Sequence, residues 1–231
     1  AGEEKEKNIT SQVQILKKPG LALNEVLKKN NQLLFQSIRS NTLNLGIFNG
    51  DVWLKFKIRN ISENSDWLIE FAHPHIRTFE FYEFQEGELS KKGTTGILFP
   101  LNSKEIPNKG FLIPVNLNYG EEKEYYFHLQ SGTSIIVNLH LWEKNSYIVQ
   151  ASVENFLYGI FLGIMAVMAF YNLFIFLSTG ESAYLYYILY IICFTIMQEA
   201  KNGFMYVTFL QAYPVISNNI VPLFIPLAVV F

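Results

Sequence analysis

Residues 155–178 read NFLYGIFLGIMAVMAFYNLFIFLS, and this stretch decides the fold of the chain. Its 24 residues include no Asp, Glu, Lys or Arg. An α-helix rises about 1.5 Å per residue, so a run of this length crosses the roughly 30 Å hydrocarbon core of a bilayer. The stretch therefore predicts a transmembrane helix.

Further apolar stretches follow this one. The segment 178–182 is long enough only for a tight reversal, so we expect a second helix that packs against the first. A third apolar run begins near Ile216 and continues to Phe231 without a polar stop. We therefore expect residues 147–231 to be the truncated start of a multi-helix transmembrane domain, with helices at about 155–178, 183–198 and 216–231.

The charged residues lie almost entirely before Asn155. The sequence has 18 Lys and Arg and 20 Asp and Glu, and only Glu181, Glu199 and Lys201 come later. The first two-thirds of the chain therefore has the composition of a water-soluble domain, whereas the last third would expose a very large apolar surface in water. The near balance of acidic and basic residues before Asn155 argues against a nucleic-acid partner.

The charged part of the chain shows the two-residue period of β-strands. In residues 52–59, Leu54, Phe56 and Ile58 alternate with Trp53 and with basic residues, as expected for a strand with one buried face. The same alternation recurs in further short segments, whose apolar positions are Trp67, Ile69 and Phe71; Phe79 and Phe81; Phe111, Ile113 and Val115; Tyr125, Phe127 and Leu129; and Ile135, Val137, Leu139 and Leu141.

Turn-forming segments separate these predicted strands, with no helical period between them; they are 60–66, 87–96, 102–110, 118–120 and 130–133. This spacing predicts a mainly β domain, an antiparallel β-sandwich or jelly roll, over residues 21–146. We expect residues 1–20 to form a polar N-terminal lead and a short helix to lie near residues 23–29.

The wetter strand faces carry the side chains that we predict to bind a ligand. If Leu139 and Leu141 point inward, the opposite face of that strand presents Asn138, His140 and Trp142. By the same alternation, the wetter faces of two other strands present Tyr126 and His128, and Trp53. Aromatic rings cover the apolar faces of sugars, and amide and imidazole groups satisfy their hydroxyls. The structural alternative is that these aromatics cover a loop or pack on the membrane domain, and Trp142 also suits an interfacial aromatic belt.

Small and polar residues in the first predicted membrane helix indicate helix packing. Gly159 and Gly163 form a G-x-x-x-G pair, which permits the close approach of another helix. The neighbour is either in the same bundle or in a second protomer, so a homodimer stays open. Asn172 lies at membrane depth, where we expect its amide to find a partner on a neighbouring helix.

Motifs for catalysis or metal binding are absent from the sequence. It contains no G-x-S-x-G elbow, P-loop, H-E-x-x-H or C-x-x-C motif, so we expect no enzyme activity and no cofactor for these residues. His73 and His75 have alternate spacing but lack an adjacent third ligand, which favours a turn over a metal site. Cys193 is the single cysteine, which excludes a disulfide framework.

Several short motifs, taken in order, resemble a known receptor family. In the β-region they are Leu45-Gly46, Trp53-Leu54-Lys55-Phe56, Asn60, Trp67, Pro74, Tyr82, Thr95-Gly96, Pro100 and Leu141-Trp142. In the apolar region they are Tyr158-Gly159-x3-Gly163, Tyr171-Asn172, Ser182-x-Tyr184-x2-Tyr187 and Asn202-Gly203. Together they resemble the bacterial seven-transmembrane receptors with diverse intracellular signalling modules, the 7TMR-DISM family.

The resemblance implies a topology and a function. It implies a periplasmic jelly-roll domain similar to carbohydrate-binding modules, seven helices in the inner membrane, and a cytoplasmic kinase, cyclase or phosphatase module beyond this chain. Segment 178–182 would then be a cytoplasmic turn. We expect the β-domain to bind a small polar ligand, such as a saccharide, and to signal through the helices to a cytoplasmic module or partner, with residues 142–154 as the covalent route.

Other functional classes fit the same architecture less well. A membrane-anchored carbohydrate-binding or adhesion module would lack the signalling output. A ligand-gated channel also joins an extracellular β-sandwich to helices, but it requires a polar stripe along the pore, and the predicted helices offer only Asn172.

Overall fold

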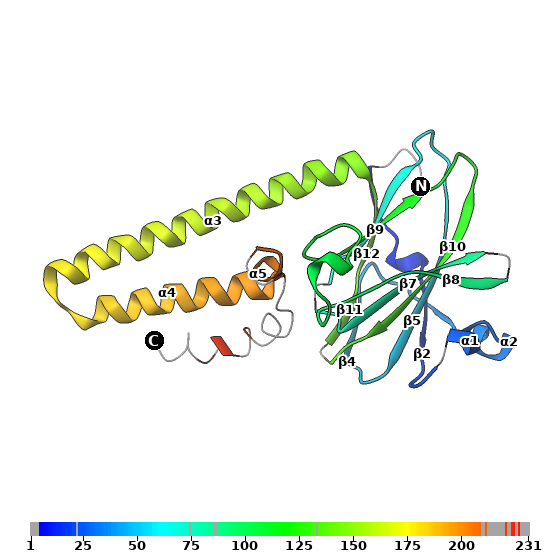
Figure 1. The fold of residues 1–231 in the computed structure, drawn as a ribbon, viewed down its shortest axis with the longest axis horizontal. Helices are drawn as coiled ribbons and strands as arrows, with labels where there is room; N and C mark the ends of the chain where they lie inside the picture. Colours follow the sequence, from blue (N-terminus) through cyan, green and yellow to red (C-terminus); the bar gives the residue numbers. More distant parts are fainter. Residues whose placement is uncertain are drawn as a thin grey trace. The chain divides into compact units, whose positions relative to one another are not determined.

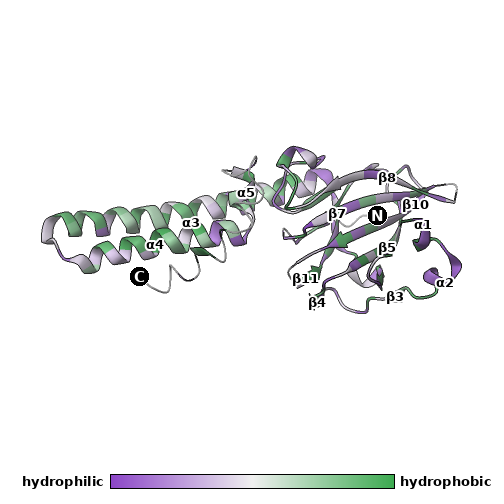
Figure 2. Ribbon diagram, turned by 60° about the horizontal axis from the view of Figure 1, so that its bottom comes forward, coloured by the Kyte–Doolittle hydropathy of each residue, from purple (hydrophilic) through white to green (hydrophobic). Residues whose placement is uncertain are grey.

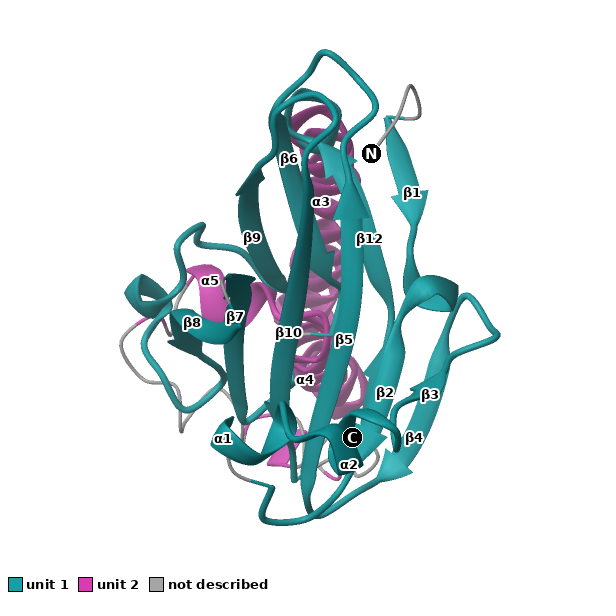
Figure 3. Ribbon diagram, turned by 90° about the vertical axis from the view of Figure 1, so that its right-hand side faces the viewer, with its two compact units in different colours: residues 1–147 teal, residues 148–231 magenta. Residues whose placement is uncertain are grey.

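The computed structural model describes residues 5–21, 23–73, 75–85, 87–132 and 134–208, together with residues 211, 220, 223, 224 and 226. The chain divides into two compact units, Ala1–Tyr147 and Ile148–Phe231 (Figure 3). The boundary lies a few residues before the predicted start of the first membrane helix, so the charge discontinuity in the sequence marks a structural division.

Unit 1 is an antiparallel β-sandwich (Figure 1). One sheet has the strand order β3-β2-β5-β10-β7-β8, with bounds Gln36–Ser37, Gln14–Lys17, Asp51–Arg59, Glu122–Gln130, Thr78–Gln85 and Glu88–Thr95. The other has the order β1-β12-β6-β9, with bounds Glu6–Asn8, Leu139–Glu143, Asp66–Phe71 and Phe111–Asn116. A small two-stranded sheet pairs β11 (Ser134–Val137) with β4 (Leu43–Ile47), and two 3-10 turns lie at Thr10–Gln12 and Leu101–Ser103.

The main core lies between the two large sheets, because alternate residues of each strand point inward. The predicted apolar positions of all six strand segments are buried in this core, so the two-residue period is confirmed. Phe79 of β7 and Phe111 of β9 stack with ring centroids 4.6 Å apart and planes at 3°. This pair joins strands of different sheets, and burial of each ring stabilises the sandwich by about 1.5–3 kcal/mol.

A second, smaller core lies on the outer face of the six-stranded sheet. Two short helices, α1 (Leu23–Val26) and α2 (Lys29–Gln32), accompany this face. The apolar side chains here pack into one cluster made of Leu16, Leu21, Val26, Trp53, Tyr82 and Tyr126. The predicted short helix is therefore present over residues 23–26, and a second short helix follows it at residues 29–32.

Two expectations about unit 1 are wrong. The polar lead assigned to residues 1–20 contains β1, which pairs with β12, and β2, which pairs with β5. The stretch 87–96, read as a turn, contains the edge strand β8. Both mistakes have one cause: a short or edge strand has few buried side chains, so its sequence shows no apolar alternation, although backbone hydrogen bonds still hold it in the sheet.

Unit 2 begins within one long helix. α3 (Lys144–Thr179) has 36 residues, and α4 (Ser182–Lys201) and α5 (Phe204–Thr208) follow it. Both α3 and α4 are long and apolar enough to cross a membrane. Figure 2 shows that apolar residues are frequent in both helices, whereas apolar and polar residues alternate along the strands. Gly180, at φ 71°, ends α3 and donates its N–H to the Phe176 carbonyl at 2.8 Å.

The predicted helix bounds differ from the observed ones at one main point. The tight reversal after residue 178 is present, but α3 begins at Lys144 and not near residue 155. An uncharged run marks only part of a helix, and residues 144–154, which include the charged Lys144 and Glu154, are also helical. The predicted third helix, at 216–231, lies almost entirely outside the described residues.

Candidate ligand-binding site

Trp53 and Tyr126 lie on the outer face of the six-stranded sheet, as the alternation predicts, but this face is not wet. Each side chain is only 1% exposed, because both pack in the small core with Val26 of α1. The indole Nε1 of Trp53 is buried and has no hydrogen-bond partner among the residues that the structure describes. In this conformation neither ring is open to a ligand.

His128 of β10 lies beside Trp53 and bridges two carboxylates. Its Nε2 is 2.8 Å from Asp51 Oδ1, and its Nδ1 is 2.8 Å from Glu80 Oε2. Ionised carboxylates accept hydrogen bonds, so each ring nitrogen of His128 faces an acceptor. Asp51 also accepts from Gln130 Nε2 at 2.7 Å and from the Gly20 N–H at 2.6 Å. His128 therefore links strands β5, β10 and β7.

The two carboxylates that flank His128 stay ionised well below neutral pH. Burial acts to raise the pKa of Glu80, but hydrogen bonds from Lys91, His128 and Tyr82 outweigh it and lower the pKa to about 2. Burial likewise acts to raise the pKa of Asp51, but hydrogen bonds from Gln130, His128 and the Gly20 N–H outweigh it and leave the pKa lowered. This network holds strands together, and its polar atoms are occupied by protein partners.

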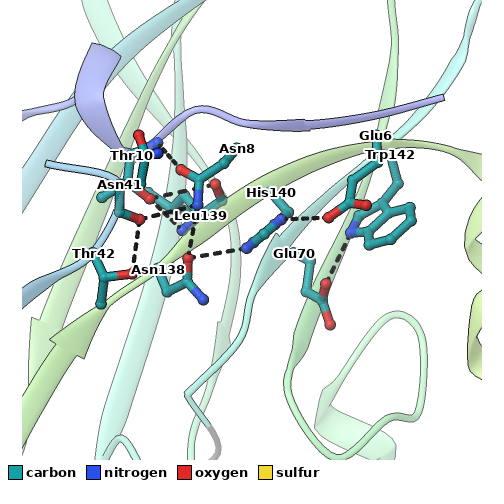
Figure 4. Close-up of polar contacts among 10 residues, drawn as sticks. All are labelled: Glu6, Asn8, Thr10, Asn41, Thr42, Glu70, Asn138, Leu139, His140 and Trp142. Carbon is teal, nitrogen blue, oxygen red and sulfur yellow. Dashed lines mark hydrogen bonds and ion pairs between the residues drawn. The ribbon is translucent and has the colours of Figure 1, made fainter. Parts of the chain in front are cut away.

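Asn138, His140 and Trp142 lie on the outer face of the four-stranded sheet, and Figure 4 shows their contacts. The two ring nitrogens of His140 each lie 2.9 Å from an acceptor, Glu6 Oε1 on one side and Asn138 Oδ1 on the other. Trp142 Nε1 donates to Glu70 Oε2 at 2.8 Å, and the Trp142 side chain is 8% exposed. Each of these polar groups is thus held by a neighbouring strand.

The six predicted ligand residues therefore do not form one site. Trp53, Tyr126 and His128 lie on one sheet and His140 and Trp142 on the other, with Asn138 directly before β12. Packed sheets lie about 10 Å apart, so one small ligand cannot contact both outer faces. In this structure the aromatic side chains of the set pack on other segments of unit 1.

A pocket of about 560 Å³ lies in the inter-sheet space, lined by residues of β7, β8, β9 and β10 and of the segment 102–105. Strands β8 and β9 are the last strands of their sheets, so the pocket lies at an edge where the sandwich is open. Its volume falls in the usual range for small-molecule sites, about 300–1,000 Å³. Its lining combines rings with hydroxyl and amide groups: Phe79, Phe81, Phe111, Tyr125, Thr94, Thr95, Asn102, Ser103 and Asn116. We refer to it as the inter-sheet pocket.

Charged side chains at one side of the inter-sheet pocket form ion pairs with one another. Glu83 is 8% exposed and pairs with Lys92 Nζ at 3.1 Å and Lys123 Nζ at 3.4 Å. Burial acts to raise the pKa of Glu83, but the two lysines outweigh it and leave the pKa lowered. The sequence held one signal of this pocket: Glu83 and Lys123 occupy inward positions of the β7 and β10 periods, where an apolar residue is expected.

Lys104 forms another part of the pocket lining. Its side chain is buried, and Nζ donates to the carbonyls of Asn108 at 2.6 Å and Gly110 at 2.8 Å. The ammonium also lies 4.7 Å from the centroid of the Phe111 ring, a cation–π distance. Burial lowers the pKa of Lys104 to about 7. The segment Lys104–Gly110 is therefore organised around one lysine.

In unit 2, the polar residues of α3 contact α3 itself and α4. Asn172 Nδ2 donates to the Met168 carbonyl of its own helix at 2.8 Å, and a partner for Asn172 on a neighbouring helix stays a prediction. Tyr158 Oη donates to the Gln198 carbonyl at 3.2 Å and accepts from Asn202 Nδ2 at 2.9 Å. The Tyr158 ring also stacks on Phe204, with centroids 3.9 Å apart.

The glycine pair of α3 does not mediate the contact with α4. No described atom lies within 4 Å of a Cβ built on Gly159 or Gly163, apart from the helix backbone and immediate neighbours. Their role in packing against a further helix or a second protomer stays a prediction.

His73 and His75 lie close together, and His73 bonds a neighbouring strand. Their ring centroids are 6.2 Å apart, and His73 Nε2 donates to the Ser134 carbonyl at 2.9 Å. Burial lowers the pKa of His73, and His75 lowers it further. Within the described part of the chain, no three His, Cys, Asp or Glu side chains are grouped to hold a metal.

Comparison with protein-family models matches both parts of the chain. Residues 10–143 match the family described as 7TMR-DISM extracellular 2, and residues 154–231 match the family described as 7TM diverse intracellular signalling. No curated protein matches the chain.

Among solved structures, the chain is similar to two carbohydrate-binding modules. One is the C-terminal CBM6 of LamC, a marine laminarinase from Zobellia galactanivorans: identity is 14%, coverage is 60% of this chain and 90% of that chain, and the TM-score is 0.28. The other is TmCBM61, solved in complex with β-1,4-galactotriose: identity is 8%, coverage is 60% and 87%, and the TM-score is 0.28.

Proposed function

This chain belongs to the 7TMR-DISM family of sensory membrane receptors, and from that premise we propose that its extracytoplasmic β-unit binds a small polar ligand of the saccharide class in the inter-sheet pocket. We also propose that the receptor resides in the bacterial inner membrane with the β-unit in the periplasm. The helices then carry the signal to a cytoplasmic output module or partner.

The inter-sheet pocket is the observation that carries this proposal. The Thr95 and Ser103 hydroxyls lie 2.8 Å apart on its wall, next to the buried rings of the main core. Hydroxyl pairs of this kind exchange hydrogen bonds readily with the hydroxyls of a polar ligand. The charged residues Glu83, Lys92 and Lys123 already pair with one another, which favours a neutral polyhydroxylated ligand over a strongly charged one.

The junction between the sheet and α3 supports signalling over passive anchoring. Strand β12 ends at Glu143 and α3 begins at Lys144, so no loop separates the sandwich from the first membrane helix. A ligand changes a receptor only through its different affinity for two states, and a direct junction lets the states of the sheet and of the helix depend on each other. An adhesion module needs no such junction.

Calorimetric titration of the full chain in detergent tests the proposal. The probes are glucose, N-acetylglucosamine, cellobiose and β-1,4-galactotriose. We expect one of them to bind, and Ser103→Ala to weaken that binding about 5- to 10-fold by removing one buried hydrogen bond. Ser90→Ala, an exposed serine on β8 outside the pocket lining, is the matched control and leaves binding unchanged. Binding of none of the four saccharides, or equal effects of the two variants on binding, would contradict saccharide binding in this pocket.

A further inference from the structure

The segment Lys104–Gly110 connects two features that are far apart in the sequence. Lys104, the first residue of the segment, lines the inter-sheet pocket, and so does Phe111, the first residue of β9, which follows the segment. The Lys104 ammonium reaches back along the segment to the carbonyls of Asn108 and Gly110, at 2.6 and 2.8 Å. The position of the Asn108 backbone is thus set by a side chain of the pocket wall.

At its other end, the segment holds the first turn of α3. The Asn108 side-chain amide donates to the hydroxyl of Tyr147, which is 9% exposed. The Tyr147 ring packs edge-on against Trp142, with centroids 5.6 Å apart, and Trp142 is itself fixed to Glu70. Tyr147 is therefore clamped between the end of β12 and Asn108.

The segment has little room to absorb a displacement. A Cβ added to Gly110 would meet the Phe71 carbonyl oxygen at 3.1 Å, so the chain passes tightly against the end of β6. Ile106 also forms an isolated bridge with Leu112. Because both ends are fixed, a shift of the Lys104 ammonium must move the Asn108 carbonyl or break its hydrogen bond.

We propose that the segment Lys104–Gly110 couples the inter-sheet pocket to α3, so that a ligand which contacts Lys104 changes how Asn108 holds Tyr147. The inference rests on the proposed function for the nature of the ligand, but the coupling itself is a property of the unliganded chain. An ammonium has three N–H donors, so a ligand oxygen near Nζ competes directly with the carbonyls of Asn108 and Gly110. Asn108 and Tyr147 are positioning residues in this scheme.

Amide hydrogen exchange on the full chain in detergent tests the coupling without any ligand. The amides of residues 148–151 donate to the carbonyls of residues 144–147 in helical geometry, so they report fraying of the first turn of α3. We expect Lys104→Met to speed exchange there at least about threefold, although Lys104 lies outside that turn. We expect Asn108→Ala and Tyr147→Phe to do the same. Asn49→Ala, an exposed asparagine outside the inter-sheet pocket, is the matched control and leaves the exchange of residues 148–151 unchanged.

Two outcomes overturn the coupling. One is faster exchange in residues 104–110 of Lys104→Met without any change in residues 148–151. The other is unchanged α3 exchange in Asn108→Ala; this variant keeps the backbone carbonyl that Lys104 binds, so it remains informative even if Lys104→Met does not fold.

The saccharide panel separates this inference from the proposed function. If no sugar binds but Lys104→Met loosens α3, the coupling stands and the proposed ligand class fails. If a sugar binds and Lys104→Met leaves α3 unchanged, the proposed function stands and the coupling fails. If a sugar binds and Lys104→Met also loosens α3, the bound sugar should change amide exchange in residues 148–151, and Asn108→Ala should abolish that change.

Discussion

The imidazole of His128 lies nearly parallel to the indole of Trp53, with ring centroids 4.4 Å apart and an angle of 14° between their planes. The stack places the imidazole on the face of a tryptophan while both ring nitrogens face carboxylates. Its location under α1 and α2 makes it a structural centre of the six-stranded sheet.

Replacement of His128 should destabilise the β-unit. His128→Leu leaves Asp51 and Glu80 partly buried without the imidazole that bridges them, which costs about 2–4 kcal/mol. For a unit of this size that corresponds to a fall in melting temperature of roughly 5–12 °C. Thermal unfolding of the full chain in detergent, followed by tryptophan fluorescence, measures the shift.

His140→Leu is the matched control for that experiment. His140 also faces a carboxylate, but the Glu6 side chain is 46% exposed, so water replaces the lost contact. We expect a loss within about 1 kcal/mol. Equal shifts for the two histidine variants would show that the His128 network has no special role.

Glu80 should make the β-unit sensitive to acid. Its pKa in the folded chain is about 2, below the usual value of 4.5, so the unfolded chain binds more protons between these two values. The stability from Glu80 is therefore fully present above about pH 4.5 and is lost as the pH falls toward 2, by on the order of 1–3 kcal/mol. Melting temperatures measured from pH 6 to pH 2 should fall less steeply in Glu80→Gln than in the wild type. Parallel slopes would rule out this contribution.

Lys104 should act in the opposite pH range. Burial lowers its pKa to about 7 from the ordinary value of 10.5, so the unfolded chain binds more protons between pH 7 and pH 10.5. This group therefore opposes folding below pH 7, and stability from this source rises as the pH increases through that window. The difference in melting temperature between Lys104→Met and the wild type, measured from pH 6 to pH 10, should shift in favour of the wild type as the pH rises. A difference that is constant with pH would contradict the burial of a charged Lys104.

Much of the fold could be predicted because burial leaves a periodic trace. Phe56, Phe81 and Phe127 occupy inward positions in three neighbouring strands, and each was predicted from alternation alone. The uncharged run after Asn155 likewise predicted a membrane-length helix. Strand β8 escaped prediction because its sequence, ELSKKGTT, buries no side chain fully and is held by backbone pairing with β7.

The candidate site was much harder to predict, because a pocket depends on residues that meet only after folding. Trp53 occupies an outward position of β5, as alternation predicts, but the segment that covers it lies some thirty residues earlier in the chain. Thr95 and Ser103 form one hydroxyl pair from two segments that both read as turns. The informative signal was a break in the pattern: Glu83 at an inward position, where a charge needs partners such as Lys92 and Lys123.

Tyr158 and Gly159 are neighbours in α3 and should respond oppositely to substitution. Tyr158→Ala removes a ring stacked on Phe204 and a hydroxyl that bonds both Gln198 and Asn202, so we expect the helices of unit 2 to lose about 1–2 kcal/mol. Gly159→Leu adds a larger side chain at a position where no described atom lies within 4 Å of the Cβ, so helix content and stability should stay unchanged or rise slightly. Circular dichroism at 222 nm during heating in detergent compares the two variants. A large loss in Gly159→Leu would show instead that a further helix or a second protomer packs on this glycine.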